Sequence, residues 1–394
     1  MRPIAASLLA LTTALVLGTS ATAQSCGGSF GNFVGQLKTQ AQAQGYPATL
    51  VDNFFAGTSQ SAAVLKADRA QGVFQKDFIE FSRMLISQNR IDAGAANWRK
   101  YRSTFDRIQQ TYGVNPGVLL AFWAFETDYG GFQGNFNTRD ALVTLAHDCR
   151  RPHLFLPQVY SALELYSRGD FDPQNTTGAW AGEIGMVQML PGDILESGVD
   201  GDGDGHVSLK TSAPDALMSG GHMLSNLGWR PNEPWLQEVS VPSNLDWSKT
   251  GIRTRLSATE WQAMGVQPRS GQMLRPDLPA SVILPMGRNG PAFLAYPNFH
   301  VYFEWNQSFT YVLTAAYFAT RLEGAPVYNA GNPEAGLSGP QIKLLQEKLQ
   351  QRGYDVGGAD GILGEKSREA VQDIQRELGL PADAWPTPAL LNRL

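Results

Sequence analysis

Residues 115–131 read NPGVLLAFWAFETDYGG, a stretch that is apolar on every side of a helix before it reaches Glu126. Asn115 and Pro116 form an N-cap and first-turn pair, and the two closing glycines are predicted to end the helix. A helix without a polar face lies inside a protein, so we expect this one in the core. The stretch therefore predicts a mainly α-helical fold with Glu126 in the last turn of a buried helix.

Glu126 is the candidate catalytic residue. Burial and the negative end of the helix dipole both disfavour the ionised carboxylate, so we expect a raised pKa for this group. A carboxyl group that is protonated near neutral pH can protonate the oxygen of a glycosidic bond. The alternative is a glutamate that only caps or pairs at a helix end. Asp128 faces elsewhere, so the chemistry needs either one carboxylate or a distant acid such as Asp140 or Glu183.

Length and composition limit the classes of protein to consider. The chain has 394 residues, of which 43% are hydrophobic and 17% charged, so we expect an ordered protein with at least two folding units. Its net charge is −5 and no basic stripe runs through it, which disfavours a nucleic-acid partner. The five histidines show no H-E-x-x-H pattern, which disfavours a zinc amidase.

The N-terminus is typical of an exported protein. Residues 1–23 carry a charged start, an apolar stretch and an A-x-A exit, and we predict a cleavable signal peptide rather than a membrane anchor. We expect a periplasmic protein without a transmembrane segment in the mature chain. An oxidising compartment favours a disulfide between Cys26 and Cys149 over two inert thiols.

Composition and periodicity divide the mature chain into segments. Phe30 to Gln110 is predicted to be a helical scaffold, Pro231 to Pro297 to contain short β pieces, and Asn306 to Leu322 to be helical. Residues 329–336 contain breakers without apolar periodicity and are predicted to be a linker. We therefore expect a catalytic domain over residues 24–328 and a small module over residues 337–394.

The C-terminal module has the pattern of two helices around a Gly-rich loop. Ser338 begins the first helix with a capping-box pattern, residues 354–364 form the loop, and a short third helix is expected from Pro388 to Leu394. The D-G-x-x-G turn of this loop and the second helix resemble the peptidoglycan-binding domain family. A DNA-reading helix-turn-helix is disfavoured, because the module has seven basic and eight acidic residues.

A calcium loop is predicted from Asp200 onward. Asp200, Asp202 and Asp204 occupy positions 1, 3 and 5, a glycine occupies position 6, and the backbone carbonyl of His206 occupies position 7. Thr211 stands at position 12, so we expect Asp215 to close the loop in place of the usual glutamate. Calcium would act here as a structural clamp and not in catalysis. The alternative is an Asp-Gly turn without metal.

Several further motifs resemble the lytic murein transglycosylase B family when they are taken in order with the helix and the calcium loop. They are FWAFET with the following Gly130, D-A-L-x-T-L from Asp140, Arg150-Arg151, the glycine-rich block 178–191, and W-N-x-S-x-x-Y from Trp305. The resemblance covers roughly residues 63–322. It implies a lysozyme-like helical catalytic domain with small β pieces, joined to the three-helix peptidoglycan-binding module.

The resemblance also implies roles for individual residues. The single catalytic glutamate of the family corresponds to Glu126, and no cofactor takes part in catalysis. Met189 and Trp305 replace a Phe and a Tyr of the family pattern. The amide of Gln188 could orient an N-acetyl or hydroxyl group. The predicted substrate-binding residues are Arg150, Arg151, Gln188, Met189, Trp305, Asn306 and Tyr311.

This family cleaves the bond between MurNAc and GlcNAc in peptidoglycan glycan strands and forms 1,6-anhydroMurNAc ends. The resemblance implies the same glycosidic bond lyase activity here, with glycan strands as the partner. We expect the enzyme to be a monomer. Two alternatives stay open on the sequence: a muramidase-type hydrolase that admits water, and a non-catalytic peptidoglycan-binding protein in which Glu126 is structural.

Overall fold

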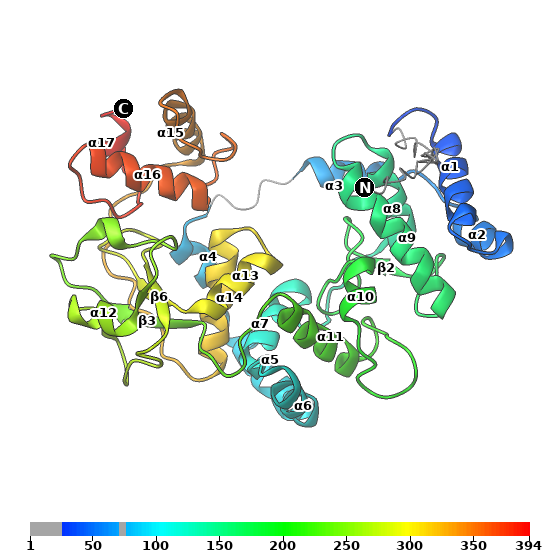
Figure 1. Cartoon of the computed structure of the whole chain (residues 1–394), viewed down its shortest axis with the longest axis horizontal. Helices are drawn as coiled ribbons and strands as arrows, with labels where there is room; N and C mark the ends of the chain where they lie inside the picture. The colour runs from blue at the N-terminus through cyan, green and yellow to red at the C-terminus, as the bar shows by residue number, and fades with distance from the viewer. Residues whose placement is uncertain (1–25, 71–75) are drawn as a thin grey trace, which may run out of the picture.

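The computed structural model describes residues 26–70 and 76–394, and the predicted signal peptide at residues 1–23 lies outside this range. The described chain is mainly α-helical, with one small sheet and one short two-stranded ladder (Figure 1). The predicted fold class is confirmed. In the described part of the chain, none of the helices has the length and apolar character needed to cross a membrane.

Two hydrophobic cores organise the helices that precede the C-terminal module. One core gathers the helices at the N-terminal end together with three from the middle of the chain: α1 (Phe30–Ala43), α2 (Ala48–Phe55), α3 (Ala62–Arg69), α8 (Thr138–His147), α9 (Pro152–Arg168) and α10 (Pro191–Ser197). The other core gathers α4 (Phe78–Leu85), α5 (Gln88–Lys100), α6 (Arg102–Tyr112), α7 (Pro116–Thr127), α11 (Ala213–Asn226), α13 (Pro297–Trp305) and α14 (Phe309–Leu322).

Helix α7 is the buried helix expected from the sequence. Every residue from Pro116 to Ala124 is buried, and the helix packs closely on α14. A Cβ atom on Gly117 would lie 2.7 Å from the backbone oxygen of Ala319, so only glycine allows this approach of the two helices.

Both ends of α7 differ in detail from the expectation. Asn115 is the N-cap residue, but its side chain makes no capping bond and donates to Glu323 at 3.5 Å. The helix ends at Thr127, before the glycines, because Asp128 and Tyr129 adopt positive φ angles of 52° and 58°. The hydroxyl of Thr127 accepts from the Gly130 amide at 2.9 Å and so fixes the turn that follows Glu126.

The β pieces predicted between Pro231 and Pro297 form one antiparallel sheet with the order β4-β6-β7-β3-β5. A third core, centred on Trp261, fills the space between this sheet and the short helices beside it. The strands and helices are β3 (Leu236–Ser240), η2 (Trp247–Lys249), β4 (Leu256–Ser257), α12 (Ala258–Ala263), β5 (Gln267–Pro268), β6 (Pro279–Ile283) and β7 (Ala292–Ala295). A separate ladder pairs β1 (Phe136–Asn137) with β2 (Thr177–Gly178).

The C-terminal module has the three helices predicted: α15 (Gly339–Gln351), α16 (Glu365–Glu377) and α17 (Pro388–Leu391). Apolar side chains from all three helices form its own small core, including Leu345, Leu349, Val371, Ile374 and Leu390.

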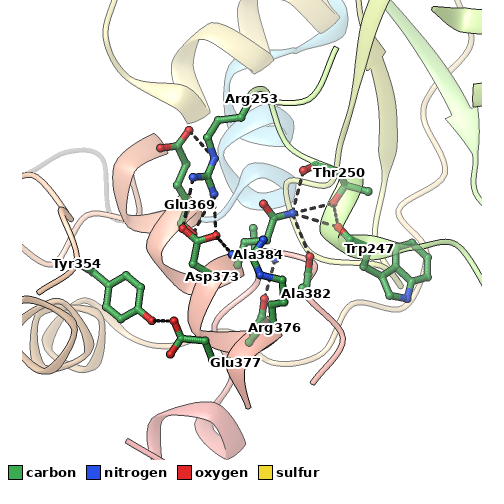
Figure 2. Close-up of polar contacts among 12 residues, drawn as sticks. Trp247, Thr250, Arg253, Tyr354, Glu369, Asp373, Arg376, Glu377, Ala382 and Ala384 are labelled. Carbon is green, nitrogen blue, oxygen red and sulfur yellow. Dashed lines mark hydrogen bonds and ion pairs between the residues drawn. The ribbon is translucent and has the colours of Figure 1, made fainter. Parts of the chain in front are cut away.

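The module packs against the rest of the described chain through one face of α16. Arg253, which precedes β4, forms ion pairs with Glu369 at 3.3 Å and Asp373 at 3.2 Å (Figure 2). The side-chain amide of Gln372 is buried and donates to the backbone oxygen of Thr250 at 2.8 Å. The guanidinium of Arg368 lies 4.5 Å above the ring of Phe309. Polar, ionic and aromatic contacts thus hold the module in one position.

Residues 329–336, the segment expected to be a linker, contain neither helix nor strand. They nevertheless run along the protein surface in fixed contacts. The amide of Asn332 donates to the backbone oxygen of Asn289 at 2.8 Å, and the indole of Trp385 donates to the backbone oxygen of Glu334 at 2.9 Å. The module is therefore joined to the rest of the described chain by a segment that is itself bound to the protein surface.

Candidate active site

Glu126 lies in the last turn of α7 with its side chain only partly exposed. The hydroxyl of Tyr311, from the first turn of α14, donates to Glu126 Oε1 at 2.5 Å. Among the described residues no lysine or arginine forms an ion pair with this carboxyl group. The site therefore stabilises the ionised form by hydrogen bonding and not by an ion pair.

Burial raises the pKa of Glu126 to about 7, the largest effect on this group. Hydrogen bonds from Tyr311 and Trp305 lower the pKa, and the nearby negative charge of Glu183 raises it. Loss of water dominates, so close to neutral pH the group is present in both its protonated and ionised forms. The raised pKa matches the expectation drawn from an apolar helix. Of the two causes expected there, burial is the main one.

Glu183, one of the two distant acids considered from the sequence, lies close enough to Glu126 for its charge to act on that carboxyl group. Burial raises its pKa, and the charge of Arg151 acts in the opposite direction. Its Oε2 atom is shielded from solvent and has no hydrogen-bond partner within the described chain. Asp140, the other distant candidate, pairs with Arg139 at 2.8 Å and accepts from Ser59. Of the two, only Glu183 acts electrostatically on Glu126.

An aromatic wall stands beside the acid. Trp305, the last residue of α13, stacks on Phe122 of α7 with ring centroids 4.1 Å apart and an angle of 20°. Phe125 packs edge-on against Tyr311 with centroids 5.9 Å apart. These contacts bring α13 and α14 to the end of α7 and exclude water from the acid. One face of Trp305 is therefore covered by Phe122 within the protein.

Gln188 lies in the glycine-rich block, in the left-handed region with φ of 52°. Its amide nitrogen donates to the backbone oxygen of Gly185 at 2.7 Å and of Gln133 at 3.5 Å. The hydroxyl of Thr127 donates to the backbone oxygen of Met186 at 2.7 Å, which ties this block to the residue after Glu126. Because the amide hydrogens are used internally, the carbonyl oxygen of Gln188 is the atom left for a ligand.

Two of the predicted substrate-binding residues, Met189 and Asn306, have side chains that are partly or wholly engaged within the protein. Met189 is only 1% exposed and packs in the core of the N-terminal helices, so its side chain supports the block and offers no surface to a sugar. The side-chain oxygen of Asn306 accepts from the Ser308 amide at 2.9 Å, at the turn before α14. Its amide group is the part available for a ligand.

Arg150 and Arg151 lie in the turn between α8 and α9. Both form ion pairs with Asp68 of α3, a carboxylate that is only 1% exposed. The neighbouring Cys149 forms a disulfide with Cys26, with the two Cα atoms 5.2 Å apart. Asp68 was not predicted as a site residue, because it lies more than 80 residues from the arginines and no local pattern marks it.

The aspartates of the predicted calcium loop come together. Asp200, Asp202 and Asp204 place one carboxylate oxygen each within 4.8 Å of one another. Asp215 is fully buried and accepts from the amides of Gly201 at 2.9 Å and Ser208 at 2.8 Å. Asp215 is therefore occupied in holding the loop, and it does not belong to the group of three.

His206 at position 7 uses its side chain outside the loop centre, since Nδ1 lies 2.9 Å from Asp170. Its backbone carbonyl is the group that the sequence pattern assigned to the metal. Three converging carboxylates are hard oxygen ligands of the kind that Ca²⁺ prefers, so the residues present fit this ion.

Comparisons with known proteins place this geometry in a family. The Transglycosylase SLT domain family matches residues 29–320, which is most of the chain. The chain belongs to this family. The peptidoglycan binding domain family matches residues 338–394. The prediction of a lytic murein transglycosylase with a C-terminal peptidoglycan-binding module is thereby confirmed at the level of the families.

Individual relatives agree with this family assignment. Membrane-bound lytic murein transglycosylase B of Escherichia coli is 27% identical over 240 residues, which is 60% of this chain and 64% of that protein. The structure of SltB3 from Pseudomonas aeruginosa, in complex with NAG-anhNAM-pentapeptide, has a TM-score of 0.85 and 35% identity. The match covers 93% of this chain and 99% of the SltB3 chain. SltB1 of the same organism has a TM-score of 0.65 and 25% identity, over 74% of this chain and 99% of that one.

Proposed function

We propose that this chain cleaves the glycosidic bond between MurNAc and GlcNAc in peptidoglycan and leaves a 1,6-anhydroMurNAc end. The observation that carries the proposal is the partly shielded carboxyl of Glu126, with a pKa of about 7 and no ion-pair partner among the described residues. A fragment of peptidoglycan is bound by the similar SltB3, whose structure contains NAG-anhNAM-pentapeptide.

Glu126 serves twice in this reaction. As an acid it donates its proton to the oxygen that leaves with GlcNAc, and the bond from this oxygen to C1 of MurNAc breaks. As a carboxylate it then takes the proton from the C6 hydroxyl of the same MurNAc while O6 bonds to C1. The carboxyl group returns to its starting state, so the cycle is balanced without water or a second carboxylate.

Intramolecular attack explains why one carboxyl group is sufficient. The C6 hydroxyl is already attached to the sugar, and well-oriented intramolecular reactions reach effective molarities of ~10⁵ M or more. Tyr311 holds Oε1 of Glu126 through its hydroxyl, which fixes the direction in which the acid points. The carbonyl of Gln188 and the amide of Asn306 are the atoms we assign to the acetamido and hydroxyl groups of the glycan.

Product analysis tests the proposal. Purified peptidoglycan is digested with the parent enzyme and with the Glu126→Gln variant, and the fragments are weighed by mass spectrometry. The anhydro product is one water (18 Da) lighter than the hydrolysis product, so a reducing end would instead establish the muramidase alternative. Equal release of fragments by a folded Glu126→Gln variant would show that Glu126 is not the catalytic acid, and no release by the parent would leave the non-catalytic, peptidoglycan-binding alternative.

We further propose that Ca²⁺ binds the loop of Asp200, Asp202 and Asp204 as a structural clamp, with the backbone carbonyl of His206 as an additional ligand. The three carboxylates converge, and Asp215 supports the loop from beneath by accepting its amides. Three negatively charged carboxylates around one cation favour binding, and the ion takes no part in the transfer of protons.

The remaining assignments rest on the sequence. Residues 1–23 are proposed to direct export to the periplasm and to be removed, and the disulfide at Cys26 is consistent with an oxidising compartment. We assign residues 24–328 to the catalytic domain, 329–336 to the linker and 337–394 to the peptidoglycan-binding domain. We expect the enzyme to act as a monomer on glycan strands.

A further inference from the structure

The turn between α8 and α9 carries two arginines whose side chains are exposed by 45% and 34%, respectively. Arginine side chains on a surface are normally free to change rotamer. Here Arg150 also donates from its guanidinium to the backbone oxygen of Asp68 at 3.0 Å, in addition to the ion pair with the carboxylate of this residue. Arg151 pairs with the same carboxylate and lies 5.3 Å above the ring of Phe155.

Three further contacts hold the backbone of this turn. The disulfide fixes Cys149, directly before Arg150, to Cys26. Arg69, next to Asp68, pairs with Asp148 at 3.3 Å. The amide of Gly27 donates to the backbone oxygen of His147 at 2.9 Å. The turn is therefore restrained at each of the residues from His147 to Arg151.

The charges of the cluster do not cancel. Asp68 supplies one negative charge and the two arginines supply two positive charges, so one positive charge is left over at the exposed guanidinium groups. Nε of Arg151 is shielded from solvent and has no hydrogen-bond partner in the described chain. Glu183, whose charge acts on both Arg151 and Glu126, places this cluster within electrostatic reach of the acid.

We propose that Asp68 is a positioning residue that fixes Arg150 and Arg151 as a receptor for a carboxylate on the substrate. This proposal rests on the function proposed above and names the substituent that the site selects. Two guanidinium groups held in one place match the planar geometry of a carboxylate, and little side-chain freedom is lost on binding. MurNAc carries such a group on its lactyl ether, either free or at the end of an attached peptide.

Binding of a product-like disaccharide tests this without turnover. GlcNAc-1,6-anhydroMurNAc is prepared in three forms: with a free lactyl carboxylate, with the lactyl group capped as a primary amide, and with a short peptide that ends in a free carboxylate. Dissociation constants are measured by calorimetry for the full-length parent, for Asp68→Asn, and for the control Asp148→Asn. The control removes an ion pair of the same turn that does not touch Arg150 or Arg151.

The parent is expected to bind at least one carboxylate form roughly tenfold more tightly than the amide, since hydrogen bonds to charged groups are stronger than neutral ones. Asp148→Asn should keep this preference, and Asp68→Asn should reduce it to about twofold because the guanidinium groups lose their fixed geometry. Whichever of the two carboxylate forms shows the preference identifies the source of the group, the lactyl ether or the peptide.

The preference is a ratio between two ligands on one protein sample, so partial unfolding of a variant cancels from it. If Asp68→Asn does not fold, Arg150→Gln and Arg151→Gln, which keep the buried carboxylate, replace it and should each weaken the preference. Equal binding of all three ligands by the parent, or an undiminished preference in Asp68→Asn, would overturn the proposal. The proposed reaction would survive either result, because cleavage by Glu126 is measured separately in the product analysis.

Discussion

Glu126 and the aspartates of loop 200–206 carry the same carboxyl group in opposite surroundings. At Glu126, burial raises the pKa to about 7 and two side-chain hydrogen bonds only partly oppose this. At Asp200, the amides of Gly205, Gly203 and Asp204 donate to a partly exposed carboxylate and lower its pKa. Solvation and the number of donors, and not the residue type, make one group an acid and the other a cation ligand.

The largest effect is expected from a substitution of Glu126 itself. We expect Glu126→Gln to lower the rate of glycan cleavage about 10³-fold or more, because general acid–base catalysis contributes 10²–10⁴-fold and this residue acts in both steps. Rates are measured on purified peptidoglycan. Glu323→Gln is the matched control, since Glu323 contacts the opposite end of α7 through the amide of Gly117 at 3.3 Å. Comparable losses in both variants would contradict a catalytic role.

The same substitution should stabilise the protein by an amount that depends on pH. The folded-state pKa of Glu126 is about 7 against an ordinary value of 4.5, so ionisation begins to destabilise the fold above the unfolded pKa and the cost is complete above about 7. Glutamine removes this cost. The melting temperature of Glu126→Gln should therefore exceed that of the parent at pH 8 and match it at pH 4, as measured by circular dichroism.

In the loop 200–206, Asp200→Ala should abolish stabilisation by calcium. A ligand at 100 times its Kd stabilises a protein by about 2.7 kcal/mol, so we expect the parent to melt several degrees higher in calcium than in chelator. The variant should melt at the same temperature in both. Its rate per folded molecule should stay close to that of the parent, and an equal melting temperature of the parent in both conditions would refute the clamp.

Tyr311→Phe sharpens the comparison by removing one donor from Glu126. The hydrogen bond lowers the pKa of Glu126, so its loss should raise the pKa and move the alkaline limb of the pH–rate profile to higher pH. The rate at the optimum should fall roughly tenfold, because a hydrogen bond to a charged group is worth about 1.5–3 kcal/mol. Tyr302→Phe is the control, since the buried hydroxyl of Tyr302 has no partner among the described residues. A shift toward lower pH would contradict this interpretation.

Glu183→Gln should have the smallest effect and the opposite sign. Removing the nearby negative charge lowers the pKa of Glu126, so the alkaline limb should move to lower pH by less than about one unit. Glu347→Gln, on the exposed face of α15, gives the background for an uninvolved carboxyl group. Coincident profiles for the parent and Glu183→Gln would show that the two carboxyl groups are not coupled in solution.

Local sequence patterns predicted much of this molecule. The apolar run before Glu126 predicted a buried helix, and the Asp-Gly repeat predicted that three carboxylates converge, because both features depend on residues close together in the chain. The left-handed turn at Asp128 was not predicted. It depends on Thr127, whose hydroxyl donates to Met186, a residue 59 positions away.

Long-range contacts explain the other differences. Asp68 pairs with arginines that follow it by more than 80 residues, so no local pattern could mark it. The buried position of Met189 depends on the packing of several N-terminal helices around the glycine-rich block. The fixed linker depends on Trp385, whose partner Glu334 is 51 positions away. Such contacts become visible only when the fold brings the segments together.

The docked C-terminal helices have a consequence for shortened forms of the enzyme. Arg368 covers Phe309, the first residue of α14, and Tyr311 of the same helical turn contacts the acid. Deleting residues 337–394 would leave an aromatic ring bare at the root of that turn. A trimmed enzyme should unfold at lower urea concentration and cleave even soluble, short glycans more slowly. The C-terminal module would then also stabilise the helix that carries Tyr311.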